Sequence, residues 1–424
     1  MLKLPVYLDH AATTPCDPRV VEAMLPYFTE KFGNPGSRNH QFGWESEEAV
    51  ETARERCAAI IGAQPKEVVF TSGSTEGNNL AIKGAAEMYA LKAEGQEGRG
   101  HIITSAIEHK AVLDPCKRLQ KRGFDVTYLE PPRDGIVTAE MVKAAMREDT
   151  ILVTIMWANN EMGTINEVPQ IGALCHERNV VFHTDATQWV GKMPTDVEKD
   201  NIDLLTWSSH KIYGPKGVGG LYIRRRKPRI RLVAQQEGGG QERGYRSGTL
   251  NVTGIVGFGK ACEICANEMD TLERERLSAC PPRSSRVVDD QECRACPYQR
   301  APREGLAHIT NMSFGFVEGE GLMMAIKDIA VSSGSACTSR LARVSRMCLR
   351  ASAATTSCAL VPPLLARSLS TKEQIDFAIE KLTWAVNHLR ELALCGTCTR
   401  KASISPPSSG AHHWNPFRNT PPPR

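Results

Sequence analysis

The first candidate for chemistry in this sequence is a lysine in a turn of small, polar and glycine residues. Lys211 stands in the stretch 208–220, Ser-Ser-His-Lys-Ile-Tyr-Gly-Pro-Lys-Gly-Val-Gly-Gly, between two short apolar segments that are typical of strands. A lysine whose ammonium is poorly solvated has a lowered pKa and can form a Schiff base with an aldehyde. The alternative is a surface lysine in a glycine hairpin, which is the commoner situation for a lysine taken alone.

Polar residues follow other apolar segments in the same way. A Gly/Ser/Thr turn at 71–77 joins a strand predicted at 68–70 to a helix predicted at 79–90. Such a turn can present backbone N–H groups and hydroxyls to a phosphate, although an ordinary capped helix has the same pattern. Asp185 follows the apolar segment 180–184, so its carboxylate needs a cation or hydrogen-bond donors. A protonated pyridine nitrogen would serve, and so would a salt bridge or a helix cap.

The elements that must position these residues alternate along the chain. Predicted strands at 101–105, 124–129, 151–156 and 180–184 are separated by predicted helices. This alternation requires crossovers between parallel strands and predicts a doubly wound α/β sheet. Ligands of such sheets bind outside the carboxyl ends of the strands. We therefore expect one site to collect four polar strand ends, which are Glu108-His109, Asn159-Asn160-Glu161, Asp185-Ala186-Thr187-Gln188 and Ser208-Ser209-His210-Lys211.

Length and composition restrict the class of protein. The 424 residues predict two domains or one large domain with an appendage, and 41% hydrophobic and 24% charged residues are typical of a soluble globular protein. A net charge of +4 gives no reason to expect a nucleic-acid partner, and no run of about 18 apolar residues predicts a membrane span. The N-terminal residues resemble neither a signal peptide nor a transit peptide. The 14 scattered cysteines favour a reducing compartment over a disulfide framework.

Several motifs together resemble those of one family. They are Tyr-Leu-Asp-His-Ala-Ala-Thr-Thr-Pro at 7–15, Phe-Gly-Asn-Pro-Gly-Ser-Arg at 32–38, Phe-Thr-Ser-Gly-Ser-Thr-Glu at 70–76, Ser-His-Lys-Ile-Tyr-Gly-Pro-Lys-Gly at 209–217 and Val-Ser-Ser-Gly-Ser-Ala-Cys-Thr-Ser at 331–339. The chain resembles the cysteine desulfurases of the iron–sulfur cluster type, which are found in bacteria and mitochondria. These are fold-type I enzymes that use pyridoxal 5′-phosphate. The resemblance implies a mostly parallel, doubly wound sheet and a smaller α+β domain.

The resemblance also implies a role for each matching residue. Lys211 would hold the cofactor and move the Cα proton of the substrate. His109 would stack on the pyridine ring and act in proton transfer. Cys337 would be the nucleophile that takes the sulfur of L-cysteine as a persulfide and leaves L-alanine. The other cofactor contacts would be Asp185 at the ring nitrogen, Asn160 and Gln188 near the phenolic oxygen, and Ser74, Thr75, Ser208, His210 and Thr249 at the phosphate.

Partners and domains follow from the same resemblance. Thr249 would reach the phosphate of a second subunit, which implies a homodimer. The sulfur would pass to an iron–sulfur scaffold protein and to other acceptors, including those of tRNA thiolation, and a eukaryotic protein would also need a small helical stabilising partner. The expected compartment is the mitochondrial matrix or the bacterial cytoplasm. The expected domains are an N-terminal arm at 1–15, a large cofactor-binding domain at 16–260, a smaller domain at 261–393 and a disordered Pro/Ser-rich tail at 394–424.

The resemblance breaks abruptly in three segments, 280–303, 340–369 and 394–424, which is consistent with local reading-frame errors. In the second segment Pro363 stands where the family has the arginine that holds the substrate carboxylate, and Arg367 lies close by in the sequence. Two alternatives therefore stay open: a cofactor-binding but catalytically impaired homologue that acts as a structural partner, and another fold-type I lyase or aminotransferase. The pairs Cys293/Cys296 and Cys395/Cys398 match a four-cysteine zinc site, but both lie in these anomalous segments and we expect no metal.

Overall fold

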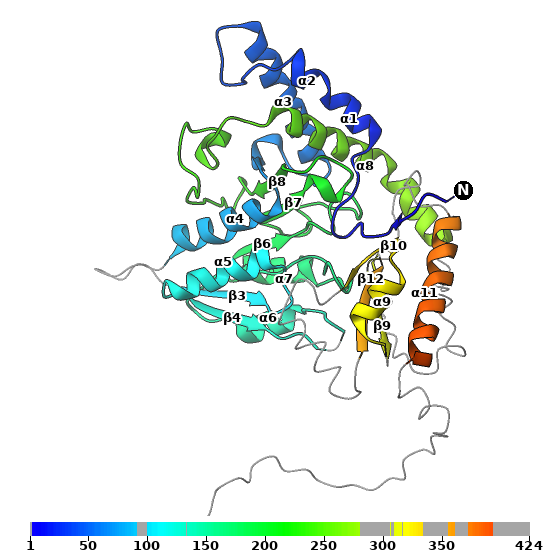
Figure 1. Cartoon of the computed structure of the whole chain (residues 1–424). Coiled ribbons are helices and arrows are strands. Elements are labelled where there is room, and N and C mark those ends of the chain that lie inside the picture. Colours follow the sequence, from blue (N-terminus) through cyan, green and yellow to red (C-terminus); the bar gives the residue numbers. More distant parts are fainter. Residues whose placement is uncertain are drawn as a thin grey trace, which may run out of the picture.

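The computed structural model describes residues 2–90, 100–132, 134–279, 306, 309–315, 317–333, 355–360 and 372–392. Its central element is a seven-stranded sheet with the strand order β2-β8-β7-β6-β5-β3-β4 (Figure 1). The strands are β2 (Val68–Thr71), β3 (His101–Ser105), β4 (Asp125–Leu129), β5 (Thr150–Thr154), β6 (Val181–Asp185), β7 (Leu204–Ser208) and β8 (Gly219–Ile223). The strands from β7 to β4 are mutually parallel, whereas β8 runs antiparallel to both of its neighbours. The predicted mostly parallel sheet is confirmed.

Helices cover both faces of this sheet. Successive side chains of each strand point to opposite faces, so neighbouring residues of one strand pack against helices on different faces. Val69 packs with α4 (Ser74–Tyr89) and α5 (Lys110–Lys121) in one core. Val68 and Phe70 belong to the other core, with the helices α3 (Gln41–Ala59), α6 (Ala139–Ala145), α7 (Val168–Glu177) and α8 (Val252–Ala279). Ahead of them in the sequence, α1 (Pro18–Met24) and α2 (Pro26–Thr29) lie near α8 (Figure 1).

The helix predicted at 79–90 begins earlier, at Ser74. The turn ends at Gly73, whose φ of 147° suits a residue without a side chain, and the Glu76 carboxylate accepts a hydrogen bond from the Ser72 N–H at 2.8 Å. These two features start the helix five residues before the predicted position. Ser74 and Thr75 are therefore the first two residues of α4, where backbone N–H groups remain free of helical partners.

The N-terminal residues pair with the C-terminal part of the chain. The strand β1 (Val6–Tyr7) runs parallel to β10 (Ile329–Ala330), and β9 (Thr310–Gly315), β11 (Ser332–Ser333) and β12 (Thr355–Leu360) form an antiparallel sheet. The helices α9 (Gly319–Ala325) and α11 (Lys372–Leu392) complete this part. Val6 and Leu8 share a core with residues of β9, α9 and α11. The domain boundaries given above stay a prediction. Within the described ranges no helix is both long and apolar enough to cross a bilayer.

Candidate active site

A cavity of about 350 Å³ lies at the carboxyl ends of the parallel strands. It collects residues from all four of the strand ends that the sequence singled out, together with residues of the N-terminal segment and of β11. Its lining includes Asp9, Ala11, Ala12, Ser74, Thr75, His109, Met156, Ala158, Asn160, Glu161, Asp185, Thr187, Gln188, His210, Lys211 and Ser332. Eight of the residues predicted to bind the cofactor or act in catalysis thus share one cavity.

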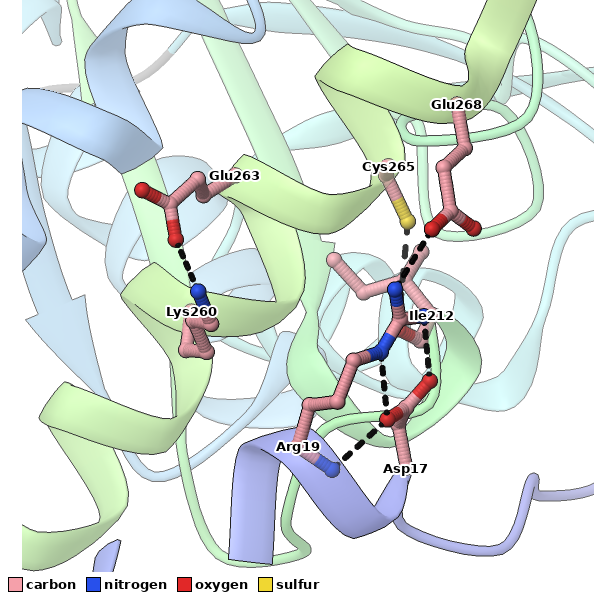
Figure 2. Close-up of polar contacts among 7 residues, drawn as sticks. All are labelled: Asp17, Arg19, Ile212, Lys260, Glu263, Cys265 and Glu268. Atoms are coloured by element: carbon pink, nitrogen blue, oxygen red, sulfur yellow. Dashed lines mark hydrogen bonds and ion pairs between the residues drawn. The ribbon is translucent and has the colours of Figure 1, made fainter. Parts of the chain in front are cut away.

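Lys211 lies in a short 3-10 turn, Ser209–Lys211, that follows β7 directly. Its Nζ donates hydrogen bonds to the backbone carbonyls of Ala11 and Ala12, the latter at 2.8 Å. Helix α8 contacts Ile212, the residue after the lysine, because the Cys265 thiol approaches the Ile212 carbonyl at 3.9 Å (Figure 2). The N-terminal segment and α8 therefore hold the lysine turn from two sides.

An ion-pair network joins α1 to α8 beside this turn (Figure 2). Arg19 donates to the Asp17 carboxylate, which caps α1, and to the Glu268 carboxylate of α8 at 2.6 Å. The backbone N–H of Asp17 in turn donates to the carbonyl of Tyr213, two residues after the lysine. The network thus ties the start of α1 both to α8 and to the chain that leaves the site.

Asp185 ends β6 at the floor of the cavity and is 6% exposed. Its carboxylate accepts hydrogen bonds from the Asn78 Nδ2 at 2.6 Å and from the Thr187 N–H at 3.0 Å. The fully buried Asn78 lies one helical turn after Ser74 on α4. These donors fix the orientation of the carboxylate and leave it beside the cavity, where a cationic ring nitrogen could be held.

His109 and Asn160 lie in two loops that contact each other. The Nδ1 of His109 accepts a hydrogen bond from the Ala111 N–H at 3.1 Å at the start of α5, so the neutral ring carries its proton on Nε2. The Asn159 side chain donates to the Ile107 carbonyl at 3.1 Å and accepts from the backbone of the turn after Asn160. The two loops thus form one continuous wall of the cavity.

A second pocket, of about 330 Å³, adjoins the first at the start of α4. It is lined by Thr13, Ser72, Gly73, Ser74, Thr75, Glu76, Ser208, His210, Lys216 and Gly217. Gly219 of β8 lies so close to Gly73 that a Cβ on it would come within 2.8 Å of the Gly73 Cα. The Ser208 Oγ is buried and has no hydrogen-bond partner among the described residues. Free N–H groups, hydroxyls and a close backbone approach suit an oxyanion such as phosphate.

His210 is uncharged beside this pocket at neutral pH. Burial, followed by the nearby Lys211, Lys216 and Lys192, lowers its pKa to about 4. Its Nδ1 lies 3.1 Å from the Thr13 Oγ1. The imidazole can therefore act as a neutral hydrogen-bonding group toward a phosphate.

Two further polar residues line the main cavity. Gln188 donates to the Ala11 carbonyl at 3.0 Å and accepts from Lys192 at 2.7 Å, so both ends of its amide are engaged. Glu161 is partly buried, and desolvation raises the pKa of its carboxyl to about 7. The Gln188 amide and the Lys211 ammonium thus donate to the same Ala11 carbonyl. The Glu161 carboxyl can gain or lose a proton near neutrality.

The residues present fit pyridoxal phosphate. The second pocket offers the phosphate an unpartnered buried hydroxyl and a helix start, Asp185 is available to the ring nitrogen, and Lys211 is within the same cavity. Thr249 is exposed and does not line either pocket of this chain. Cys337, Pro363, Arg367 and the four cysteines of the zinc alternative lie outside the described residues.

The structure adds residues that the sequence did not assign to the site, chiefly Asn78, Thr13, Lys192 and the carbonyls of Ala11 and Ala12. A signal for Asn78 existed, because it stands four residues after Ser74 and shares its face of a helix that begins at Ser74. The N-terminal motif at 7–15 was recognised without a role. Its contacts with Gln188, His210 and Lys211 span about half of the chain.

Comparison with known proteins finds similarity over most of the chain. Residues 6–360 match the family Aminotransferase class-V. Proteins named "Cysteine desulfurase IscS" from Pectobacterium atrosepticum and Anaeromyxobacter dehalogenans are 52% and 51% identical, and each match covers 92% of this chain and 95% of the relative. Among solved structures, a "NifS-like protein" has a TM-score of 0.80 at 34% identity over 91% of this chain and all of its own. "SspA in complex with cysteine" has a TM-score of 0.69 at 35% identity over 85% of this chain and 99% of its own.

These similarities extend over both the sheet that builds the cavity and the C-terminal part of the chain. They agree with a site in which a lysine, a buried carboxylate and a phosphate pocket meet at the carboxyl ends of parallel strands. The chain belongs to the class-V aminotransferase family and, within it, to the cysteine desulfurases, whose cofactor is pyridoxal phosphate.

Proposed function

We propose that this enzyme converts L-cysteine to L-alanine and takes the sulfur onto Cys337. In this reaction the Cβ–S bond of the substrate breaks, a new S–S bond forms to the Cys337 sulfur, and Cys337 becomes a persulfide. One observation carries the proposal: Lys211, Asp185 and His109 surround a single cavity next to a phosphate pocket, in a chain that is 52% identical to a cysteine desulfurase. The solved relative with bound cysteine supports the choice of substrate.

Different residues of the chain have different roles in this reaction. Bound pyridoxal phosphate supplies an aldehyde for the substrate amine and an electron sink for the Cα carbanion. We assign the phosphate to Ser74, Thr75, Ser208 and His210, and the ring nitrogen to Asp185. Asn160 and Gln188 are assigned to the phenolic oxygen. Lys211 holds the aldehyde carbon and later moves the Cα proton, and His109 stacks on the ring and exchanges a proton through Nε2.

The active unit is proposed to be a homodimer that delivers sulfur to other proteins. The exposed Thr249, which does not line the phosphate pocket of its own chain, supports a role in the pocket of a partner subunit. An iron–sulfur scaffold protein and acceptors of tRNA thiolation would receive the persulfide sulfur. The compartment would be a bacterial cytoplasm, as the bacterial relatives suggest, or a mitochondrial matrix.

The proposal is tested by measuring alanine and sulfide formed from L-cysteine with added pyridoxal phosphate and a thiol reductant. Lys211→Ala is expected to lower the rate by at least about 1,000-fold, since it removes both the covalent attachment and the proton carrier. Lys199→Ala, which removes an exposed lysine paired with Asp196, is the control and should keep full activity. Wild-type protein that binds the cofactor but never turns over would instead support the catalytically impaired homologue.

A further inference from the structure

We propose that Glu108 is a positioning residue that works as an uncharged carboxylic acid. It joins the loop that carries His109 to the loop that carries Asn160, and so fixes the wall of the cavity against which the cofactor ring must lie. The inference rests on the proposed function of His109. Glu108 is a buried acid to which the proposed reaction gives no role, and the inference gives it a role in positioning.

The contacts of Glu108 connect two separate strand ends. Glu108 follows β3 and is 0% exposed, and its Oε1 accepts a hydrogen bond from the backbone N–H of Met156, after β5, at 2.7 Å. Beside it the Asn159 Nδ2 donates to the Ile107 carbonyl at 3.1 Å. Both bonds are donated by the loop after β5 and accepted by the loop after β3. Together they form a clasp, by which we mean the pair of bonds Met156–Glu108 and Asn159–Ile107.

The clasp acts on the cavity because its members adjoin lining residues. His109 is the next residue after Glu108, and Met156 itself lines the cavity. Asn160 follows Asn159 directly and also lines the cavity. Loss of the clasp would release His109 and Asn160 together, while Ser74, Thr75 and Ser208 at the phosphate pocket would keep their places.

The surroundings of Glu108 favour the uncharged acid. It is completely buried, and its Oε2 has no hydrogen-bond partner among the described residues. The titratable groups that act on it or respond to it are Asp185 on β6 and Cys116 on α5, and neither is a cation. Desolvation raises the pKa of Glu108 well above its usual value. The hydrogen bond from the Met156 N–H opposes this effect, and the weaker influence of the Asp185 charge adds to it.

Glu108 and Asp185 lie in different environments and therefore have different roles. Asp185 accepts hydrogen bonds from Asn78 and Thr187 and lines the cavity, where it is available to a cationic ring nitrogen. Glu108 keeps its proton and so adds no second negative charge near Asp185. Pairs of acids whose environments differ in this way commonly divide into a charged and a neutral member.

The test compares Glu108→Gln with Glu108→Leu. Glutamine is uncharged and keeps an oxygen for the Met156 N–H, so this variant should retain kcat within about threefold of wild type. Leucine removes the acceptor, and the release of His109 should lower kcat by up to about 100-fold. The dissociation constant of pyridoxal phosphate, measured by fluorescence titration, should stay within about threefold in Glu108→Gln. In Glu108→Leu the release of His109 and Asn160 should weaken cofactor binding by a smaller factor than it lowers kcat, because the phosphate pocket is untouched. A general collapse of the fold would instead weaken cofactor binding and kcat together.

Thermal unfolding of the cofactor-free proteins supplies a readout that does not depend on the reaction. An acid whose pKa is raised in the folded state loses stability as pH rises above its unfolded pKa of about 4.3, because only the unfolded chain releases the proton. The gain in Tm of Glu108→Gln over wild type should therefore widen between pH 5 and pH 8.

The inference is overturned if Glu108→Gln loses as much kcat as Glu108→Leu, if Glu108→Leu keeps full kcat, or if the Tm difference stays constant with pH. Absence of turnover in wild type would count against the proposed function, and the Tm series would still decide the charge state of Glu108.

Discussion

Ser208 illustrates how much one buried hydroxyl can contribute to cofactor binding. Its Oγ lies in the phosphate pocket without a partner among the described residues, so a phosphate oxygen would satisfy it. A hydrogen bond to a charged group contributes about 1.5–3 kcal/mol, so Ser208→Ala should weaken pyridoxal phosphate binding by about 10- to 100-fold. A fluorescence titration of the cofactor measures this change.

Ser209 is the matched control for that experiment. Its Oγ is also buried without a partner among the described residues, but it is directed at Gly214 and does not line either pocket. Ser209→Ala should therefore leave the cofactor affinity unchanged within about twofold. Equal losses in the two variants would show that Ser208 acts through the fold and not through the phosphate.

At this scale the sequence predicted the residues that stand in motifs and missed those that support them. Lys211, Asp185 and His109 were found because each ends a predicted strand, and parallel strands bring such ends together. Asn78 was missed because the helix was expected to begin after it. The carbonyls of Ala11 and Ala12 carry no signature in the sequence, since any residue has a carbonyl and only the folded chain brings them to Lys211.

Among the elements, the loop 238–249 depends on a buried ion pair. Arg54 on α3 donates to both carboxylate oxygens of Glu242 at 2.8 Å, and the Phe70 N–H donates to the same carboxylate at 2.7 Å. Glu242 and Arg243 have φ values of 48° and 57°, a strained region for residues with side chains. The pair therefore holds the loop that ends at Thr249 in a conformation it would not adopt alone.

Glu242→Ala should lower the free energy of unfolding by about 3–5 kcal/mol, because it leaves the buried Arg54 guanidinium with only the exposed Glu51 as a counter-charge. Urea unfolding at neutral pH measures the loss. Glu263→Ala removes partly exposed pairs with Lys260 on α8 (Figure 2) and with Arg56 on α3, and should cost less than about 1 kcal/mol. Similar costs for both variants would mean that the Glu242 pair does not anchor the loop.

The elements themselves were largely predictable, whereas their ends and partners were not. The cysteines of α8, Cys262 and Cys265, pack in the core, as expected of free cysteines, which behave as small hydrophobic residues. The start of α4 depends on Gly73 and on the contact between Glu76 and Ser72, which propensity alone does not reveal. The pairing of β1 with β10 joins residues more than 300 positions apart, and no local pattern specifies it.

For the whole molecule, three histidines with strongly lowered pKa values should contribute to the response to acid: the buried His10 and His183 and the partly buried His210. Burial is the main reason why the pKa values of His10, His183 and His210 are each lowered to about 4. Between about pH 6.5 and pH 4 the unfolded chain binds protons at these positions and the folded chain does not, so these histidines lower the stability as pH falls through that range, against the opposite contribution of Glu108. Urea unfolding at pH 7, 5.5 and 4.5 measures the loss.

A substitution separates this effect from general acid denaturation. The ring of His183 bridges Thr154 and Thr206 across neighbouring strands, so His183→Gln should reduce the loss between pH 6.5 and pH 4, whatever it costs at neutral pH. His388→Gln, at an exposed position of α11, should leave the pH dependence unchanged. An unaltered acid response in His183→Gln would contradict the account.

The class of the whole molecule followed from the alternation of strands and helices, and its activity from motifs spread over the chain. The placement of β8, antiparallel between β2 and β7, could not be read from that alternation. It is nevertheless essential to the site, because Gly219 of β8 lets the backbone approach Gly73 at the phosphate pocket.

The most direct test of the central claim is alanine production from L-cysteine by wild type and by Cys337→Ala, each reconstituted with pyridoxal phosphate. The account predicts steady turnover by wild type and a loss of at least about 100-fold in Cys337→Ala, with the cofactor still bound, because the nucleophile for sulfur is gone. Mass spectrometry should find one added sulfur on Cys337 of wild type in the absence of reductant. Undiminished alanine production by Cys337→Ala would contradict the claim that this thiol receives the sulfur.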